Sequence, residues 1–159
     1  MNINVICVGK LKEKYWTDAV AEYSKRLGRF CTLKITELKE DRLADNASPA
    51  DEEKVKATEG TSILKAIDGD AYVIALDVRG KELSSEKLAE KVETLALDGK
   101  SNLAFIIGGS LGLSQEVLAR ADYRLSFSPM TFPHQMMRVI LLEQIYRSFK
   151  IIRNETYHK

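Results

Sequence analysis

The sequence is poor in the residues that mark several classes of protein. Its 159 residues include two cysteines, two histidines and three prolines. Cys7 and Cys31 do not form a C-x-x-C pair, and two histidines add too little for a zinc site, so we expect no metal. So few prolines, together with 45% hydrophobic residues, argue against a disordered chain.

Long apolar runs are also missing. No stretch approaches the ~20 apolar residues that span a bilayer, and the opening segment has neither a basic leader nor a small-residue cleavage site. We therefore expect a cytoplasmic protein with no membrane partner. The length suits one globular domain, residues 1–159, with a core that needs no disulfides.

The net charge of +1 is unevenly distributed along the chain. Residues 1–30 hold six basic and three acidic residues, and residues 134–159 hold five basic and two acidic residues, so the middle of the chain is acidic. If the two ends meet in space, they form a basic face suited to phosphate. The alternative is an ordinary solvated surface.

Strand-like and helix-like segments alternate along the sequence. Apolar runs predict strands at 2–9, 31–38, 71–77, 103–107 and 123–127. Amphipathic patterns predict helices at 15–29, 49–67, 84–97, 114–120 and 133–149. Ser48, Ser84 and Ser114 are suited to cap three of these helices. This alternation predicts an α/β fold, a parallel-rich sheet flanked by helices.

The last helix is unusual because its apolar residues, from Met136 to Phe149, are distributed around nearly its whole circumference. A helix this apolar needs two partners. One face can pack on the sheet, and for the other we expect a second copy of the chain. The alternative is a deep core helix in a monomer.

Three loops should meet at one edge of the sheet, at residues 77–81, 108–113 and 126–133. Ligands bind at the carboxyl ends of parallel strands, and Gly108, Gly109 and Gly112 let a ligand approach the backbone. The dinucleotide motif G-x-G-x-x-G and the P-loop motif are both absent. The pattern predicts a binding site without naming its ligand.

A serine hydrolase is one alternative, because residues 108–112 match the G-x-S-x-G nucleophile elbow. A catalytic triad could consist of Ser110, Asp122 and His134, which occur in the expected chain order. However, the chain is much shorter than hydrolases of that fold, and no oxyanion-loop segment precedes the elbow.

Several ordered motifs together resemble one family over the whole chain, the SPOUT class of methyltransferases and, within it, the ribosomal large-subunit pseudouridine N3-methyltransferases. The motifs that carry this resemblance are VGKLK at 8–12, ALD at 75–77, FIIGGS at 105–110, MTFPHQMMR at 130–138, EQIYR at 143–147 and YHK at 157–159.

The resemblance implies a trefoil knot within about residues 71–150, whose loops hold S-adenosylmethionine. It also implies a homodimer, in agreement with the apolar last helix. The implied substrate is a pseudouridine in the helix 69 loop of 23S rRNA, methylated at N3 in the assembled 70S ribosome. The implied cofactor-binding residues are Leu76, Gly108, Phe127, Ser128, Pro129, Met130, Thr131 and Phe132.

Methyl transfer from a sulfonium needs no metal, only an in-line approach and a nucleophile with a free lone pair. N3 of pseudouridine carries a proton at neutral pH, so a histidine, or a tyrosine beside basic groups, is the natural group to handle it. We predict this role for His134 and Arg138, one helical turn apart, and for Tyr157 and His158 in the tail (150–159), from the same or the other subunit. The sequence leaves open which residue is the base.

Two further alternatives remain. His134 could simply hold its loop in shape, and the protein could bind ribosomes with this fold but without catalysis.

Overall fold

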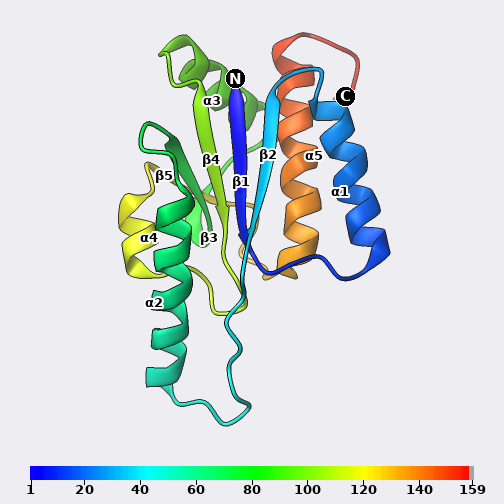
Figure 1. Cartoon of the computed structure of the whole chain (residues 1–159). Helices are drawn as coiled ribbons and strands as arrows, with labels where there is room; N and C mark the ends of the chain where they lie inside the picture. The colour runs from blue at the N-terminus through cyan, green and yellow to red at the C-terminus, as the bar shows by residue number, and fades with distance from the viewer. Residues whose placement is uncertain (158–159) are drawn as a thin grey trace.

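A computed structural model describes residues 1–157. It contains one five-stranded sheet in the order β2-β1-β4-β3-β5, and every neighbouring pair is parallel (Figure 1). The strands are β1 Asn2–Val8, β2 Thr32–Leu38, β3 Tyr72–Glu82, β4 Asn102–Ile107 and β5 Tyr123–Ser126. The helices are α1 Lys14–Leu27, α2 Pro49–Ala66, α3 Ser85–Leu97, α4 Gln115–Arg120 and α5 His134–Ile152. The predicted α/β fold is confirmed.

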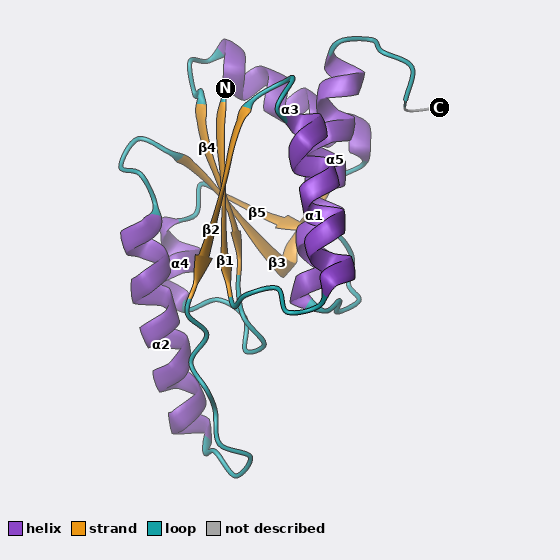
Figure 2. Cartoon of the chain, turned by 45° about the vertical axis from the view of Figure 1, so that its right-hand side comes forward, coloured by secondary structure: helices purple, strands orange, loops and turns teal. Residues whose placement is uncertain are grey.

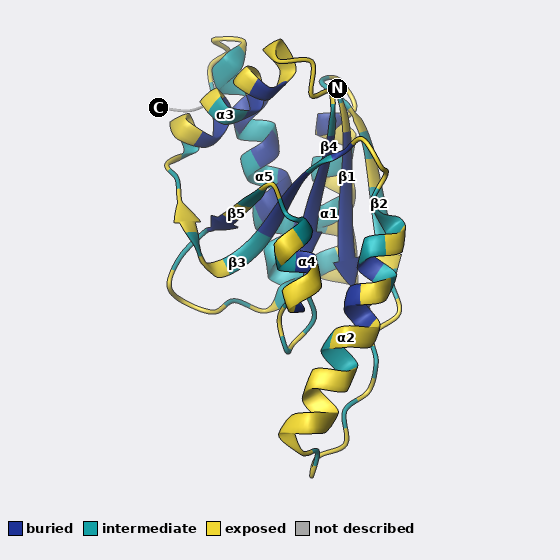
Figure 3. Ribbon diagram, turned by 90° about the vertical axis from the view of Figure 1, so that its left-hand side faces the viewer, coloured by how far each residue is buried: buried dark blue, intermediate teal, exposed yellow. Residues whose placement is uncertain are grey.

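Helices cover both faces of the sheet. Seen along its edge, α1, α3 and α5 lie on one face, and α2 and α4 lie on the other (Figure 2). Strands β1 and β4 pair in register from Asn2–Asn102 to Cys7–Ile107 at the centre, where both are almost wholly buried (Figure 3). Burial on both faces explains their continuous apolar runs.

The last helix, α5, packs on the sheet between α1 and α3. Leu141, Leu142 and Ile145 are fully buried on its inner side. On other sides Val139 and Ile140 are only partly covered by this single chain. The predicted packing of one face on the sheet is therefore confirmed, while the homodimer stays a prediction.

The three serine caps are confirmed. The side chains of Ser48, Ser84 and Ser114 each accept a hydrogen bond from a backbone amide in the first turn of α2, α3 and α4, respectively. Element ends match the predicted ones to within three residues, with one exception.

That exception is β3, which we expected to end at residue 77 but which continues to Glu82. Its pairing with β5 is interrupted by a bulge between Leu76 and Lys81, after which Lys81 pairs with Leu125. Gly80 lies so close to β5 that an added Cβ would be 2.6 Å from the Arg124 carbonyl oxygen. Part of the predicted loop is therefore a bulge within a strand.

Helix α2 extends beyond the carboxyl edge of the sheet (Figures 1 and 3). Its first turns are exposed, whereas Glu59, Gly60 and Ile63 are buried against the body of the protein. None of the helices within residues 1–157 is both long and apolar enough to cross a membrane.

Candidate functional site

A cavity of about 440 Å³ opens at the carboxyl edge of the sheet. It lies where the bulge of β3, the loop after β4 and the loop between β5 and α5 meet. All three segments that the sequence predicted for a binding site contribute to its wall. Its volume lies within the range of about 300–1,000 Å³ usual for small-molecule sites.

Most of the predicted cofactor-binding residues line this cavity. They are Leu76, Gly108, Phe127, Ser128, Met130, Thr131 and Phe132. Pro129 belongs to the same loop but is not part of the wall. The loop that the sequence singled out thus lies at the cavity, and its role in cofactor binding stays a prediction.

The loop between β5 and α5 is held in place by hydrogen bonds from its own serines. Ser126 Oγ lies 3.2 Å from the carbonyl oxygen of Val78 and 3.1 Å from that of Ser128. Ser128 Oγ in turn accepts a hydrogen bond from the Met130 amide at 3.0 Å. These contacts fix the loop against the bulge of β3.

The loop after β4 needs glycine at several positions. A Cβ on Gly108 would lie 3.0 Å from the Gly112 carbonyl carbon, and a Cβ on Gly109 would lie 3.1 Å from Glu59 Oε2 in α2. Gly112 has a φ of +82°, which favours glycine. The bare backbone of this loop therefore forms part of the cavity wall.

Charged residues that the sequence did not single out also line the cavity. Lys56 reaches it from α2, Arg79 from the bulge of β3, and Arg124 from β5. Arg124 Nε donates to Asp77 Oδ2 at 2.9 Å. Arg79 lies inside a predicted loop, but nothing in the sequence places Lys56 here, because its helix reads as largely exposed.

His134 begins α5 and lines the cavity, as predicted. Burial lowers the pKa of His134 below its usual value; nearby Glu40 acts against this and Arg138 adds to it. The imidazole is therefore neutral at neutral pH and has a lone pair free to accept a proton.

Arg138 is 1% exposed and does not line the cavity. Its Nη2 donates to the carbonyl oxygens of Val8 at 3.0 Å and Gly9 at 2.7 Å, and its Nη1 donates to Glu37 Oε2 at 2.8 Å. A guanidinium engaged in this way positions the backbone. This placement differs from the substrate-handling role that the sequence suggested.

Tyr157 lies along α5, away from His134. Its hydroxyl donates to Glu143 Oε1 at 3.1 Å, and its ring packs edge-on against Tyr146 with centroids 4.9 Å apart. Glu143 is nine positions after His134, about 14 Å along a helix axis. Burial is the main cause that raises the pKa of Tyr157 to about 12. One chain does not bring the two residues together, and His158 lies outside the described residues.

The hydrolase triad is not assembled. Ser110 is exposed in a turn, and Asp122 Oδ2 instead accepts hydrogen bonds from the Val73 amide at 2.8 Å and from Arg120 at 3.3 Å. Residues 1–157 also contain no group of three histidine, cysteine or acidic residues that could hold a metal ion.

Known proteins resemble this chain along its whole length. Residues 1–158 match the family described as "Predicted SPOUT methyltransferase". Proteins named "Ribosomal RNA large subunit methyltransferase H" are 62% identical in Clostridium novyi (strain NT) and 59% identical in Alkaliphilus oremlandii (strain OhILAs), with 100% of both chains covered. A solved structure, "a probable methylase family protein from Haemophilus influenzae Rd KW20", has a TM-score of 0.52 at 17% identity, covers 96% of this chain and 66% of that one, and shares the fold.

Proposed function

Because the chain belongs to the SPOUT methyltransferase family, we propose that it transfers a methyl group from S-adenosylmethionine to 23S rRNA of the large ribosomal subunit. The proposed acceptor is N3 of a pseudouridine in the helix 69 loop of the assembled ribosome. The observation that carries this proposal is the cavity at the carboxyl edge of the sheet. There the loop after β4 (residues 108–113, the glycine loop) meets the loop 127–132 and His134.

The cavity suits a donor of this chemistry. The side chains of Leu76, Phe127 and Phe132 give it apolar surface, and the glycine loop exposes backbone that can hydrogen-bond an adenosine. Arg79, together with Lys56, which also pairs with Glu53 at 3.0 Å, would supply positive charge for the carboxylate of the methionine end. We also assign the rest of this loop, Ser128 to Phe132, to binding of the same donor. Pro129, which does not line the cavity, would maintain the shape of the loop.

In the proposed reaction the N3 lone pair attacks the methyl carbon in line. The N–C bond forms as the C–S bond breaks, and the sulfonium becomes a neutral thioether. The proton on N3 must leave, and the neutral imidazole of His134 can accept it. Tyr157 keeps its phenol proton at neutral pH and would donate a hydrogen bond to the substrate in place of Glu143.

The charge distribution supports an RNA substrate. Helix α1 and helix α5 pack against each other, so the two basic ends of the chain lie side by side. Arg26 and Arg153 both lie over aromatic rings in this region, at 5.5 Å from Tyr23 and 4.6 Å from Phe30, respectively. Arg26 also pairs with Glu22 at 2.8 Å, but basic residues exceed acidic ones in both end segments, and such an excess suits the phosphates of a large RNA.

A homodimer would complete the site. The partly covered side of α5 offers an apolar surface for a second copy, and Tyr157 and His158 of one chain would then reach the cavity of the other. The trefoil knot within about residues 71–150 belongs to the same proposal, as does action in the cytoplasm, where ribosomes are.

The test is transfer of labelled methyl from S-adenosylmethionine to purified 70S ribosomes, followed by nuclease digestion to identify the nucleoside. Wild type should label a pseudouridine of 23S rRNA at N3. His134→Ala and a chain truncated after Glu155 should bind the donor with wild-type affinity but fail to transfer. If wild type binds ribosomes and labels neither ribosomes, subunits nor free rRNA, the protein is a binding protein and the proposal fails.

A further inference from the structure

The residues that follow β1 begin at Gly9, which lies against His134 and Arg138 at the start of α5. We call residues 9–12 the strap. The Gly9 amide donates to the Leu38 carbonyl oxygen at 2.8 Å, and the Leu11 amide donates to Glu37 Oε2 at 3.1 Å. Arg138 binds the Gly9 carbonyl oxygen at 2.7 Å. The strap backbone is therefore fixed to both β2 and α5.

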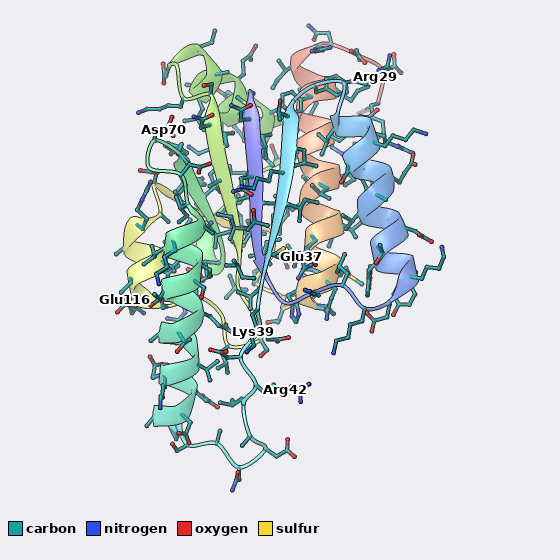
Figure 4. All side chains as sticks on the ribbon, in the orientation of Figure 1. Arg29, Glu37, Lys39, Arg42, Asp70 and Glu116 are labelled. Carbon is teal, nitrogen blue, oxygen red and sulfur yellow. The ribbon has the colours of Figure 1, made fainter. Side chains whose placement is uncertain are left out.

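Glu37 is the centre of this arrangement. It points from the end of β2 toward the first turns of α5 (Figure 4), and its Oε2 accepts hydrogen bonds from both the strap and Arg138. Because the Arg138 side chain is 2% exposed, the connection is shielded from water on that side. A shielded, charge-assisted network of this kind holds its partners rigidly.

The strap also lies beside His134. A Cβ on Gly9 would be 3.7 Å from His134 Nε2 and 3.8 Å from Arg138 Nη2. The φ of Gly9 is +88°, so this close approach depends on glycine. The position of the strap is thus set relative to the residue that we assign to proton transfer.

Two lysines of the strap, Lys10 and Lys12, are exposed. Within residues 1–157 neither forms an ion pair, whereas the next lysine, Lys14, pairs with Asp18 at 2.5 Å. Of the acids beside the strap, Glu37 is engaged by Arg138, and Glu40 approaches Gly9. The strap therefore presents two exposed positive charges within three residues of Gly9, which lies beside His134.

We infer that Lys10 and Lys12 bind backbone phosphates of the RNA strand whose base enters the cavity, and that the Arg138–Glu37 pair positions them. This inference rests on the proposed function. Lysines act as point charges on phosphates and fix register without reading sequence. Two such contacts, held at a fixed distance from His134, would place one nucleotide over the imidazole.

The test compares Lys10→Gln/Lys12→Gln with wild type. The control is Lys65→Gln/Lys100→Gln, which removes two exposed lysines at the opposite edge of the sheet. Binding to 70S ribosomes is measured by cosedimentation between 50 and 200 mM salt, roughly the range over which phosphate contacts weaken. Methyl transfer, donor affinity and oligomeric state are measured on the same samples.

The strap variant should raise KM for ribosomes about tenfold or more and reduce the salt slope by about 1.5, as expected for two lost phosphate contacts. Donor affinity and oligomeric state should not change, and Lys10→Arg/Lys12→Arg should restore binding. The control should behave as wild type does.

A wild-type salt slope in the strap variant overturns the inference. A parallel loss of donor affinity also overturns it, because the strap would then shape the cavity. If wild type binds ribosomes without transferring methyl, the proposed function fails, and the salt slopes alone still decide whether the lysines contact phosphate.

Discussion

Gly60 of α2 lies against Ser114, so closely that a Cβ on Gly60 would come within 2.3 Å of Ser114 Oγ. Ser114 caps α4 by accepting a hydrogen bond from the Val117 amide. The residue before Gly60, Glu59, lies against Gly109. Helix α2 is thus seated on both ends of the glycine loop, and its packing sets the position of one wall of the cavity.

Gly60→Ala should therefore destabilise the protein by about 1–3 kcal/mol, the usual cost of overpacking, although alanine has the higher helix propensity by about 1 kcal/mol. The free energy of unfolding in urea measures this. Gly69→Ala is the matched control, because Gly69 faces open space and should tolerate alanine. A stabilised Gly60→Ala variant would mean that α2 is not held against Ser114.

Arg138→Met should lower the free energy of unfolding by about 3 kcal/mol, because it leaves Glu37 without its partner and two buried carbonyl oxygens without a donor. Glu37→Gln should cost less, since Glu37 is 36% exposed. Guanidinium chloride denaturation measures both. An Arg138→Met variant that keeps its stability and loses methyl transfer would instead favour direct contact with the substrate.

The stability contributed by His134 should depend on pH. Its pKa is lowered in the folded state, chiefly by burial, so the unfolded chain takes up the proton first as the pH falls through about 6.5. The folded state then loses stability until its own, lower pKa is reached. Wild type should lose stability between pH 7.5 and 5.5 relative to His134→Gln, as measured by thermal unfolding. Parallel curves would show that the folded pKa is not lowered.

The contribution of Glu59 to stability should depend on pH in the opposite sense. Burial raises its pKa, Glu40 and Asp41 add to this, and the Asp41 amide, 3.2 Å from Oε1, opposes it. The folded state therefore holds this proton to higher pH than the unfolded chain does, and its stability falls as pH rises from about 4.3 through the folded pKa.

Glu59→Gln should consequently stabilise the protein near neutral pH by about 1 kcal/mol, a rise in Tm of about 2–4 °C, and the gain should disappear near pH 4. Glu53→Gln, an exposed neighbour on the same helix, is the control. Loss of stability in Glu59→Gln at neutral pH would mean that the charge itself is needed.

The sequence predicts the structural features that depend on residues close together in the chain. The buried strands follow from their apolar runs, and Ser48, Ser84 and Ser114 cap their helices where a local hydrogen bond is available. The extension of β3 was not predictable, because polar residues such as Lys81 pair with β5 across a bulge, and only the fold determines this pairing.

Contacts between residues that are distant in the chain also limit the prediction of the site. The loops carrying Leu76, Gly108 and Phe127 follow strands, so their meeting could be foreseen from the rule for parallel sheets. The burial of Arg138 could not, because its carbonyl partners lie about 130 residues earlier. Lys56 was missed likewise, since it reaches the cavity only because α2 docks on α4.

The pairing of β1 with β4 also has a consequence for biosynthesis. Asn2 pairs with Asn102, so during synthesis β1 waits for its second neighbour until β4 has been made. Helix α5, which completes both the core and the cavity, follows later still. Long-range pairing of this kind is slow to form, and we expect the site to be completed late in folding.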